Sequence, residues 1–173
     1  MAVKNVLKMG DPNLQIKSEW VTDFAGEELQ SNIGDMIDTM RHYRGVGLAA
    51  PQIGIAKRII VLEVANNPRY PQADAIALSV LINPQISDFS EQTETAWEGC
   101  LSLPGLRGKV SRARSVAYQA VNENGERKQA IVQGFLARII QHEIDHLDGI
   151  LYPQRLDDLE QFGFEDSLPD FQL

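Results

Sequence analysis

The chain has 173 residues, of which 43% are hydrophobic and 23% charged, a composition that fits one soluble globular domain spanning 1–173. The net charge of −8 argues against a general nucleic-acid binder and gives no support to binding at an anionic membrane surface. No apolar run approaches the ~20 residues needed to cross a bilayer, and the first residues lack the apolar core of a secretory signal. The single cysteine, Cys100, rules out an internal disulfide and fits a reducing compartment, so we expect a cytoplasmic protein.

The N-terminal part of the chain predicts a loop followed by a helix. Residues 1–22 mix short apolar pairs with a proline turn, and we expect them to lie as a loop against the body. Asp23 can cap a helix that Gly45 ends, and His42 is interpreted as a surface residue near that end. Apolar residues repeat at helical spacing in between, at Leu29, Ile33, Met36, Ile37, Met40 and Tyr43.

Small residues dominate the segment 45–54 that follows this helix. It allows another backbone or a ligand to approach closely, although it also fits a flexible connection to the next strand. The segment does not resemble a phosphate-binding loop, because the later glycine and the Lys-Ser/Thr pair are missing. Gln52, a carboxamide among small apolar neighbours, is its one residue of obvious chemical use.

The middle of the chain predicts short strands. Apolar and alternating runs indicate strands at 58–64, 77–86, 93–101, 115–121 and 127–132. The sequence Asn-Glu-Asn-Gly at 122–125 predicts a hairpin between the last two, and the polar segment 66–74 predicts a surface loop. We therefore expect an α+β fold, in which short antiparallel strands surround one central helix and a second helix lies near the N-terminus.

The predicted central helix carries an H-E-x-x-H pattern within the stretch 141–149. His142 and His146 lie four residues apart, so on a helix both imidazoles share one face and can bind one metal ion. Glu143, beside the first of them, is placed to act on a water molecule bound to that metal. The pattern therefore predicts that this helix carries a catalytic metal site.

A helix over 135–148 has an apolar arc and a polar arc. His142, Glu143 and His146 fall inside the apolar arc, so their side chains are expected to point into the protein. Buried ionisable groups cost several kcal/mol unless they have a partner or a metal, and three on one face favour a metal over core histidines satisfied by neighbours. The polar arc, which we expect to face solvent, holds Arg138, Gln141, Asp145 and Asp148.

A catalytic metal site usually has a third protein ligand. Tyr152 stands where the extended H-E-x-x-H protease pattern has its third histidine, so that ligand is missing. Glu160 and Glu165 lie downstream in an irregular tail, and a zinc protease that uses Glu165 stays open as an alternative. Cys100 is the better candidate, because it lies in an extended segment that can pass beside the helix, and a Cys-His-His set suits zinc, iron(II), cobalt or nickel.

Three segments together resemble the peptide deformylase family in order and spacing: 45–52 (GVGLAAPQ), 98–102 (EGCLS) and 141–146 (QHEIDH). The resemblance runs from about residue 3 to residue 155, and it implies the α+β deformylase fold with the H-E-x-x-H helix among antiparallel strands. The departures lie outside these motifs. The segment 66–77 looks like extra loop length, and the short acidic tail after Pro153 gives no pattern for a C-terminal helix.

The resemblance implies an activity, which is removal of the N-formyl group from the starting methionine of newly made polypeptides near the ribosome, with release of formate. It implies a metal held by Cys100, His142 and His146, with iron(II) as the active ion and zinc, nickel or cobalt as substitutes. Water on that metal would attack the formyl carbon, while Glu143 takes the water proton and later delivers it to the departing amine.

The resemblance also implies roles for residues that contact the substrate. The Gln52 amide and the Leu101 N–H would donate to the developing oxyanion, and Ile139 and His142 would form part of an apolar methionine pocket. The peptide would be held as an added strand by the backbones of Val46, Gly47 and Gly99. A structural metal site or a formyl-peptide binding module is the non-enzymatic alternative; Glu143 and Gln52 argue against it, because a closed structural site needs neither of them. The sequence leaves the oligomeric state open.

Overall fold

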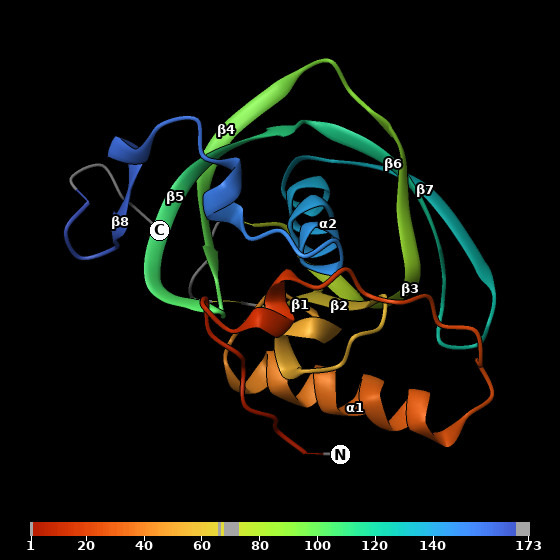
Figure 1. Ribbon diagram of the computed structural model, residues 1–173. Helices are drawn as coiled ribbons and strands as arrows, with labels where there is room; N and C mark the ends of the chain where they lie inside the picture. Colours follow the sequence, from red (N-terminus) through yellow and green to blue (C-terminus); the bar gives the residue numbers. More distant parts are fainter. Residues whose placement is uncertain (1, 66, 68–72, 169–173) are drawn as a thin grey trace.

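The computed structural model describes residues 2–65, 67 and 73–168, and it has an α+β fold (Figure 1). Helix α2 (Gly134–Leu147) lies at the centre with strands curving around it, and helix α1 (Glu27–His42) lies on the far side of the strands beneath it (Figure 1). The predicted class, with antiparallel strands, a central helix and a second helix near the N-terminus, is confirmed. Within the described ranges, neither helix has the length and apolarity of a membrane span.

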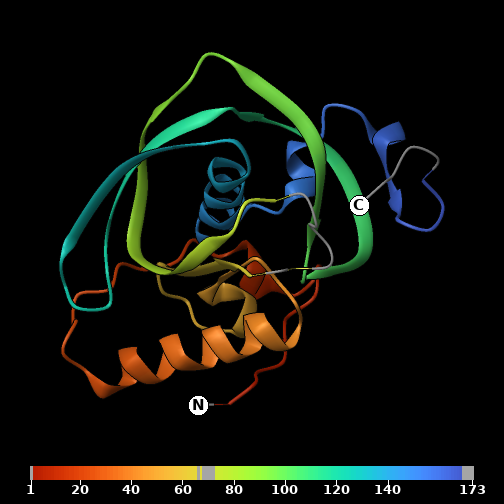
Figure 2. The same cartoon turned by 180° about the vertical axis from the view of Figure 1, so that it is seen from behind.

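The strands form two antiparallel sheets. The first has the order β1-β2-β3-β6-β7, made of β1 (Gly47–Ala49), β2 (Ile59–Val64), β3 (Ile76–Phe89), β6 (Ser115–Val121) and β7 (Arg127–Gln133). The second has the order β4-β5-β8, made of β4 (Thr93–Cys100), β5 (Leu103–Ala113) and β8 (Phe162–Phe164). Seen from behind, β3, β6 and β7 curve around α2 (Figure 2). The predicted hairpin is confirmed as β6 and β7.

The first sheet is buried where the two helices cover it. β2 is apolar and buried along almost its whole length, because one side packs toward α2 and the other toward α1. Ile60 and Leu62 belong to the core cluster with α2, whereas Ile59 and Val61 belong to the cluster with α1. This alternation of neighbouring side chains fixes the register of the strand and thereby the position of β1 beside α2.

Helix α1 begins and ends away from its predicted limits. Its N-cap is Gly26, and the carboxylate of Asp23 instead accepts a hydrogen bond from the Ala25 N–H in the preceding turn. At the other end the chain turns at Arg44, which has a φ of 55°, before Gly45 is reached. The proposed cap and stop residues therefore flank the helix rather than bound it. His42 is exposed, as predicted.

Three strands were not predicted from the sequence. The segment 45–54 is not a flexible connection, because it holds β1 and a 3-10 helix at Ala50–Ile53. β5 was missed because its glycines, proline and basic side chains hide the apolar alternation, and β8 lies in the tail that showed no pattern. β3 continues past its predicted end to Phe89. Most of the predicted 66–74 loop lies outside the described residues.

The polar arc of α2 does not face solvent, so that prediction was wrong. Arg138 and Asp145 are each 7% exposed and Gln141 is 6% exposed, and only Asp148 is partly open. Strands β4 and β5 close over this side of the helix and supply partners. Gln141, for example, exchanges hydrogen bonds with both backbone groups of Ala113. Polar residues can be buried in this way because every hydrogen-bonding group finds a partner.

Candidate metal centre

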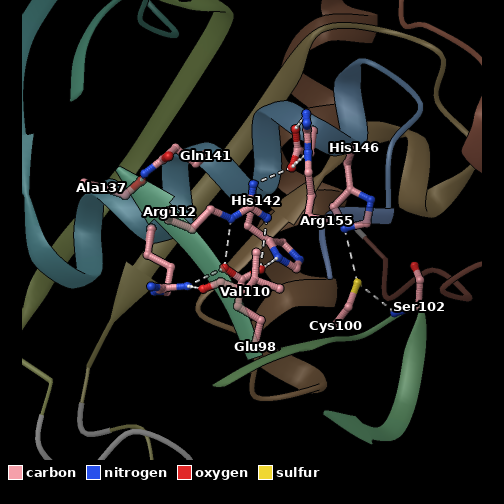
Figure 3. Close-up of polar contacts among 12 residues, drawn as sticks. Glu98, Cys100, Ser102, Val110, Arg112, Ala137, Gln141, His142, His146 and Arg155 are labelled. Atoms are coloured by element: carbon pink, nitrogen blue, oxygen red, sulfur yellow. Dashed lines mark hydrogen bonds and ion pairs between the residues drawn. The ribbon is translucent and has the colours of Figure 1, made fainter. Parts of the chain in front are cut away.

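The three predicted metal ligands lie together. Cys100 ends β4, while His142 and His146 lie one turn apart on α2. A ligand atom from each lies within 4.8 Å of the others, and Cys100 Sγ is 3.2 Å from His146 Nε2 (Figure 3). One sulfur and two imidazole nitrogens at this separation fit a single divalent ion, with further positions left for other ligands. Among the described residues this is the only such group.

The ring of His142 is held in a fixed orientation. Its Nδ1–H donates to Glu98 Oε2 at 2.9 Å, which leaves Nε2 for a metal. The ring of Tyr152 stacks on it, with centroids 6.1 Å apart and planes 26° apart. Burial lowers the pKa of His142, but hydrogen bonds and charge from Cys100 and Glu98 outweigh this and raise it well above its usual value.

The thiol of Cys100 is set to ionise. Burial raises its pKa, but the positive charge of His146 and the hydrogen bond from His142 outweigh that effect, so the pKa lies well below its usual value. The Ser102 N–H also points at the sulfur, at 3.4 Å. Because the thiolate is the form that binds a metal, this electrostatic environment suits a metal ligand.

Behind the ligands lies a buried network of ions. Arg112 of β5 donates to both oxygens of Glu98, at 2.9 and 3.0 Å (Figure 3). Arg112 also pairs with Asp145 of α2. Arg138 adds a further bond to Glu98 at 2.8 Å, and Arg155 pairs with Asp145 at 2.7 Å. Burial raises the pKa of Glu98, but the hydrogen bonds from His142 and Arg112 outweigh that effect and lower it overall. Arg112 therefore ties the strand that carries the cysteine to the helix that carries the histidines.

Glu143 lies against the backbone of β1. A Cβ on Gly47 would collide with Glu143 Oε1, so the carboxylate occupies the space that glycine leaves open. Glu143 is 5% exposed, and its Oε2 has no hydrogen-bond partner among the described residues. Burial raises its pKa, and the charges of His142 and His146 offset this only in part. The carboxylate is therefore easier to protonate than an ordinary glutamate.

The carboxamide of Gln52 has a defined orientation. Its Oε1 accepts a hydrogen bond from the Ala49 N–H at 2.8 Å, so its NH₂ group must point the other way. That group lies 3.4 Å from Cys100 Sγ and 3.2 Å from Ser102 Oγ, at the metal centre. Leu101, which lies between Cys100 and Ser102 in the sequence, lines one pocket together with Gln52 and Cys100.

One pocket gathers nearly all of the predicted site residues. It is lined by Val46, Gly47, Gln52, Gly99, Cys100, Leu101, Ile139, His142 and Glu143, while His146 lies deeper, at 1% exposure. Trp97, Arg107 and Phe135 also line it, and sequence reasoning missed them because no spacing marks them. The supporting role of Glu98 was missed too, although its place beside the Gly-Cys motif was a usable signal.

The tail carboxylates do not join the candidate ligands. Glu165 pairs with Arg107 Nη2 at 2.8 Å, and Glu160 is exposed on a 3-10 helix. The metal group of the described residues contains Cys100 in their place. The protease alternative through Glu165 thus gains no support from the geometry.

Comparison with known proteins gives consistent matches. Residues 3–162 match the family model described as Polypeptide deformylase. "Peptide deformylase 1" of Nitrosomonas europaea is 48% identical over 96% of this chain and 94% of its own length, and "Peptide deformylase 1" of Prochlorococcus marinus is 48% identical over 97% and 88%.

Solved structures match as well. The Met-Ala-Ser-bound class I type b peptide deformylase from Acinetobacter baumannii has a TM-score of 0.87 at 40% identity, covering 90% of this chain and 99% of that chain. The peptide deformylase from Thermotoga maritima has a TM-score of 0.82 at 37% identity, covering 91% and 100%. The family match ends at residue 162, where β8 begins.

Proposed function

The chain belongs to the peptide deformylase family and is a metal-dependent hydrolase, and from this premise we propose that it removes the N-formyl group from the formyl-methionine of newly made polypeptides, releasing formate. The observation that carries the proposal is the convergence of Cys100, His142, His146, Glu143 and Gln52 on one pocket. We further propose that 1–173 form one catalytic domain, which acts in the cytoplasm near the ribosome. With a net charge of −8, it would do so without binding nucleic acid directly.

The metal would be held by Cys100, His142 and His146. We propose iron(II) as the active ion, with zinc, nickel or cobalt as substitutes, because a mixed sulfur and imidazole set accepts all of them. When bound, such an ion lowers the pKa of a water molecule and so supplies a nucleophile near neutral pH. The lowered pKa of the Cys100 thiol supports its assignment as a metal ligand.

Glu143 would act as the general base and then as the general acid. Burial raises its pKa, so the carboxylate takes up a proton more readily than an ordinary glutamate, which suits a group that must accept a proton from water. Its Oε2 has no hydrogen-bond partner among the described residues, so it is available to take a proton from water. The same group would then hand that proton to the departing amine of the methionine.

Negative charge that develops on the formyl oxygen needs donors already in place. The NH₂ group of Gln52 is one, because the bond from the Ala49 N–H fixes its direction toward the site. We propose the Leu101 N–H as the second donor, since it follows the ligand Cys100 directly. One such donor typically contributes about 2.7–4 kcal/mol to transition-state stabilisation.

The substrate peptide would lie as an added strand. β1 is the edge strand of the first sheet, so the backbone near Val46 and Gly47 can pair with an incoming peptide on one side, and Gly99 can do so on the other. Ile139 and His142 would form part of the wall of the methionine pocket. The Acinetobacter baumannii relative is bound to Met-Ala-Ser, the peptide that deformylation of formyl-Met-Ala-Ser would leave.

The test is formate release from formyl-Met-Ala-Ser, measured with metal content on protein purified without oxygen. The wild type should release formate and carry metal, and Cys100→Ala should lose both. Glu160→Gln, an exposed surface change, should lose neither. A Cys100→Ala protein that keeps its metal and its activity would refute the ligand assignment. Equal activity and metal content after purification in air would count against iron(II).

A further inference from the structure

A short C-terminal strand, β8, lies at the end of the segment that matches the family. β8 pairs with β5 on the side away from β4, and it lies at the outer edge of the second sheet (Figure 1). Its register places Gly163 opposite Arg107, and the Glu165 N–H donates to the Gly105 carbonyl at 2.8 Å. The family match ends at residue 162, so all of this strand but its first residue, and the glutamate after it, follow the matched segment.

Glu165 connects this strand to the wall of the pocket. Its Oε2 lies 2.8 Å from Arg107 Nη2, and Arg107 Nη1 donates to the Leu106 carbonyl at 3.0 Å. The guanidinium lies directly over Gly99, because a Cβ at that position would collide with it. The side chain of Arg107 is 9% exposed and that of Glu165 is 42% exposed, so the ion pair runs from the surface of the tail to the pocket.

We propose that Glu165 is a positioning residue that sets how the pocket responds to charge on the substrate residues after the methionine. The inference rests on the proposed function, in which the peptide runs along Gly99. A residue that follows the methionine then comes close to the guanidinium of Arg107, which lies over Gly99. Glu165 holds that group against the strand and offsets its positive charge, so the wild type should favour acidic downstream residues less than a protein that lacks this carboxylate.

Glu165→Gln keeps the size of the side chain and removes its charge. Arg107 keeps its bond to the Leu106 carbonyl, but the charge of Glu165 no longer offsets its own, so the net charge at this wall of the pocket becomes more positive. The test compares kcat/KM for the amides of formyl-Met-Glu-Ala and formyl-Met-Lys-Ala, and of formyl-Met-Ala-Glu and formyl-Met-Ala-Lys. In Glu165→Gln the acidic-to-basic ratio should rise about threefold at one of the two positions, through KM, as expected for a partly exposed charge pair. Activity on formyl-Met amide should stay unchanged.

Two variants make the test specific. Glu160→Gln removes the same charge from an exposed residue of the same tail, and it should leave the ratio at the wild-type value. Glu165→Asp keeps a carboxylate and should retain most of that value. The inference is overturned if Glu165→Gln leaves the ratio unchanged, if Glu160→Gln shifts it equally, or if all substrates including formyl-Met amide lose the same fraction of activity. Failure of the wild type to release formate from any of these peptides would instead refute the proposed function.

Discussion

Helix α2 presents buried polar side chains in two directions, and the two groups differ in how their atoms are satisfied. Toward β4 and β5, Arg138, Gln141 and Asp145 all have partners. Arg138 donates to Glu98 and to two backbone carbonyls, and Asp145 accepts from two arginines. Such a fully paired cluster can be buried without a large net cost and fixes the position of the elements it joins.

On the side of the candidate metal centre, the same helix leaves atoms unsatisfied. Among the described residues, Glu143 Oε2 and His146 Nδ1 have no hydrogen-bond partner although both are buried. Unsatisfied buried groups cost free energy, so their presence on one face marks a site kept for chemistry rather than for stability. The comparison predicts that substitutions on the pocket face change activity, and that substitutions on the paired face change stability.

The largest effect is expected for Glu143→Gln, which removes the proton carrier from the pocket face. Formate release should fall by about 10⁴-fold, the upper end for general acid–base catalysis, because in the proposed mechanism the residue serves two proton transfers. Thermal unfolding should be unchanged or slightly higher in temperature, since the variant replaces a buried carboxylate that lacks a full set of partners. A variant that keeps its activity, or one that loses stability in parallel with activity, would break the contrast between the two faces.

The paired face is tested by Arg112→Met. This substitution removes a charged partner from the buried carboxylates of Glu98 and Asp145. The free energy of unfolding should therefore fall by about 3–5 kcal/mol in urea titrations. Arg155→Met is the matched control, because Arg155 pairs with the same aspartate but its side chain is 46% exposed. Its cost should stay below about 1 kcal/mol. Equal losses for the two variants would mean that burial of the pair does not matter.

A smaller loss of activity is expected for Gly47→Ala. The added methyl group would collide with Glu143 Oε1 and displace the carboxylate, so formate release should fall by about 10²-fold. The same substitution made in the Glu143→Gln protein reports whether that displacement is the cause. It should cost almost nothing further there if the two residues act through one contact. A full additional loss in the double variant would show that Gly47 acts by another route.

The sequence predicted those features that depend on local patterns. The pairing of His142 and His146 follows from helical spacing, the β6–β7 hairpin from its turn residues, and the candidacy of Cys100 from its being the only cysteine. The structure brings these residues together, whereas their roles in catalysis stay predictions. What could be read in advance was which residues share a face or a turn.

The sequence could not predict features that depend on distant partners. Arg112 and Arg138 look like exposed side chains in any local window, and they are buried because Glu98 and Asp145 reach them from 14 to 40 residues away. The β5 strand was missed for the same reason, since its basic residues are satisfied by other elements. The tail was read as irregular, because the single bond between Glu165 and Arg107 gives no periodic signal.

The smallest expected effect is a pH dependence of the free energy of unfolding, which arises from Glu98, the partner of the paired face of α2. Its pKa in the folded protein is lowered, because the bonds from His142 and Arg112 outweigh the opposing effect of burial. The unfolded chain therefore binds the proton more tightly, and the stabilisation is complete above the ordinary carboxyl pKa of about 4.3. It is lost as the pH falls below that value, by up to ~1.4 kcal/mol per pH unit.

Urea titrations at pH 5, 4 and 3 should therefore show a steeper loss of stability in the wild type than in Glu98→Gln. Acid also protonates the proposed metal ligands, and Glu98 raises the pKa of His142, so the difference between the two slopes reports the coupled pair of Glu98 and His142. Glu63→Gln is the comparison, since hydrogen bonding to Arg41 likewise lowers the Glu63 pKa, but the side chain of that arginine is 52% exposed. Solvent screens that pair, so its removal should flatten the slope less. Equal slopes for the wild type and Glu98→Gln would mean that the buried network does not stabilise the ionised carboxylate.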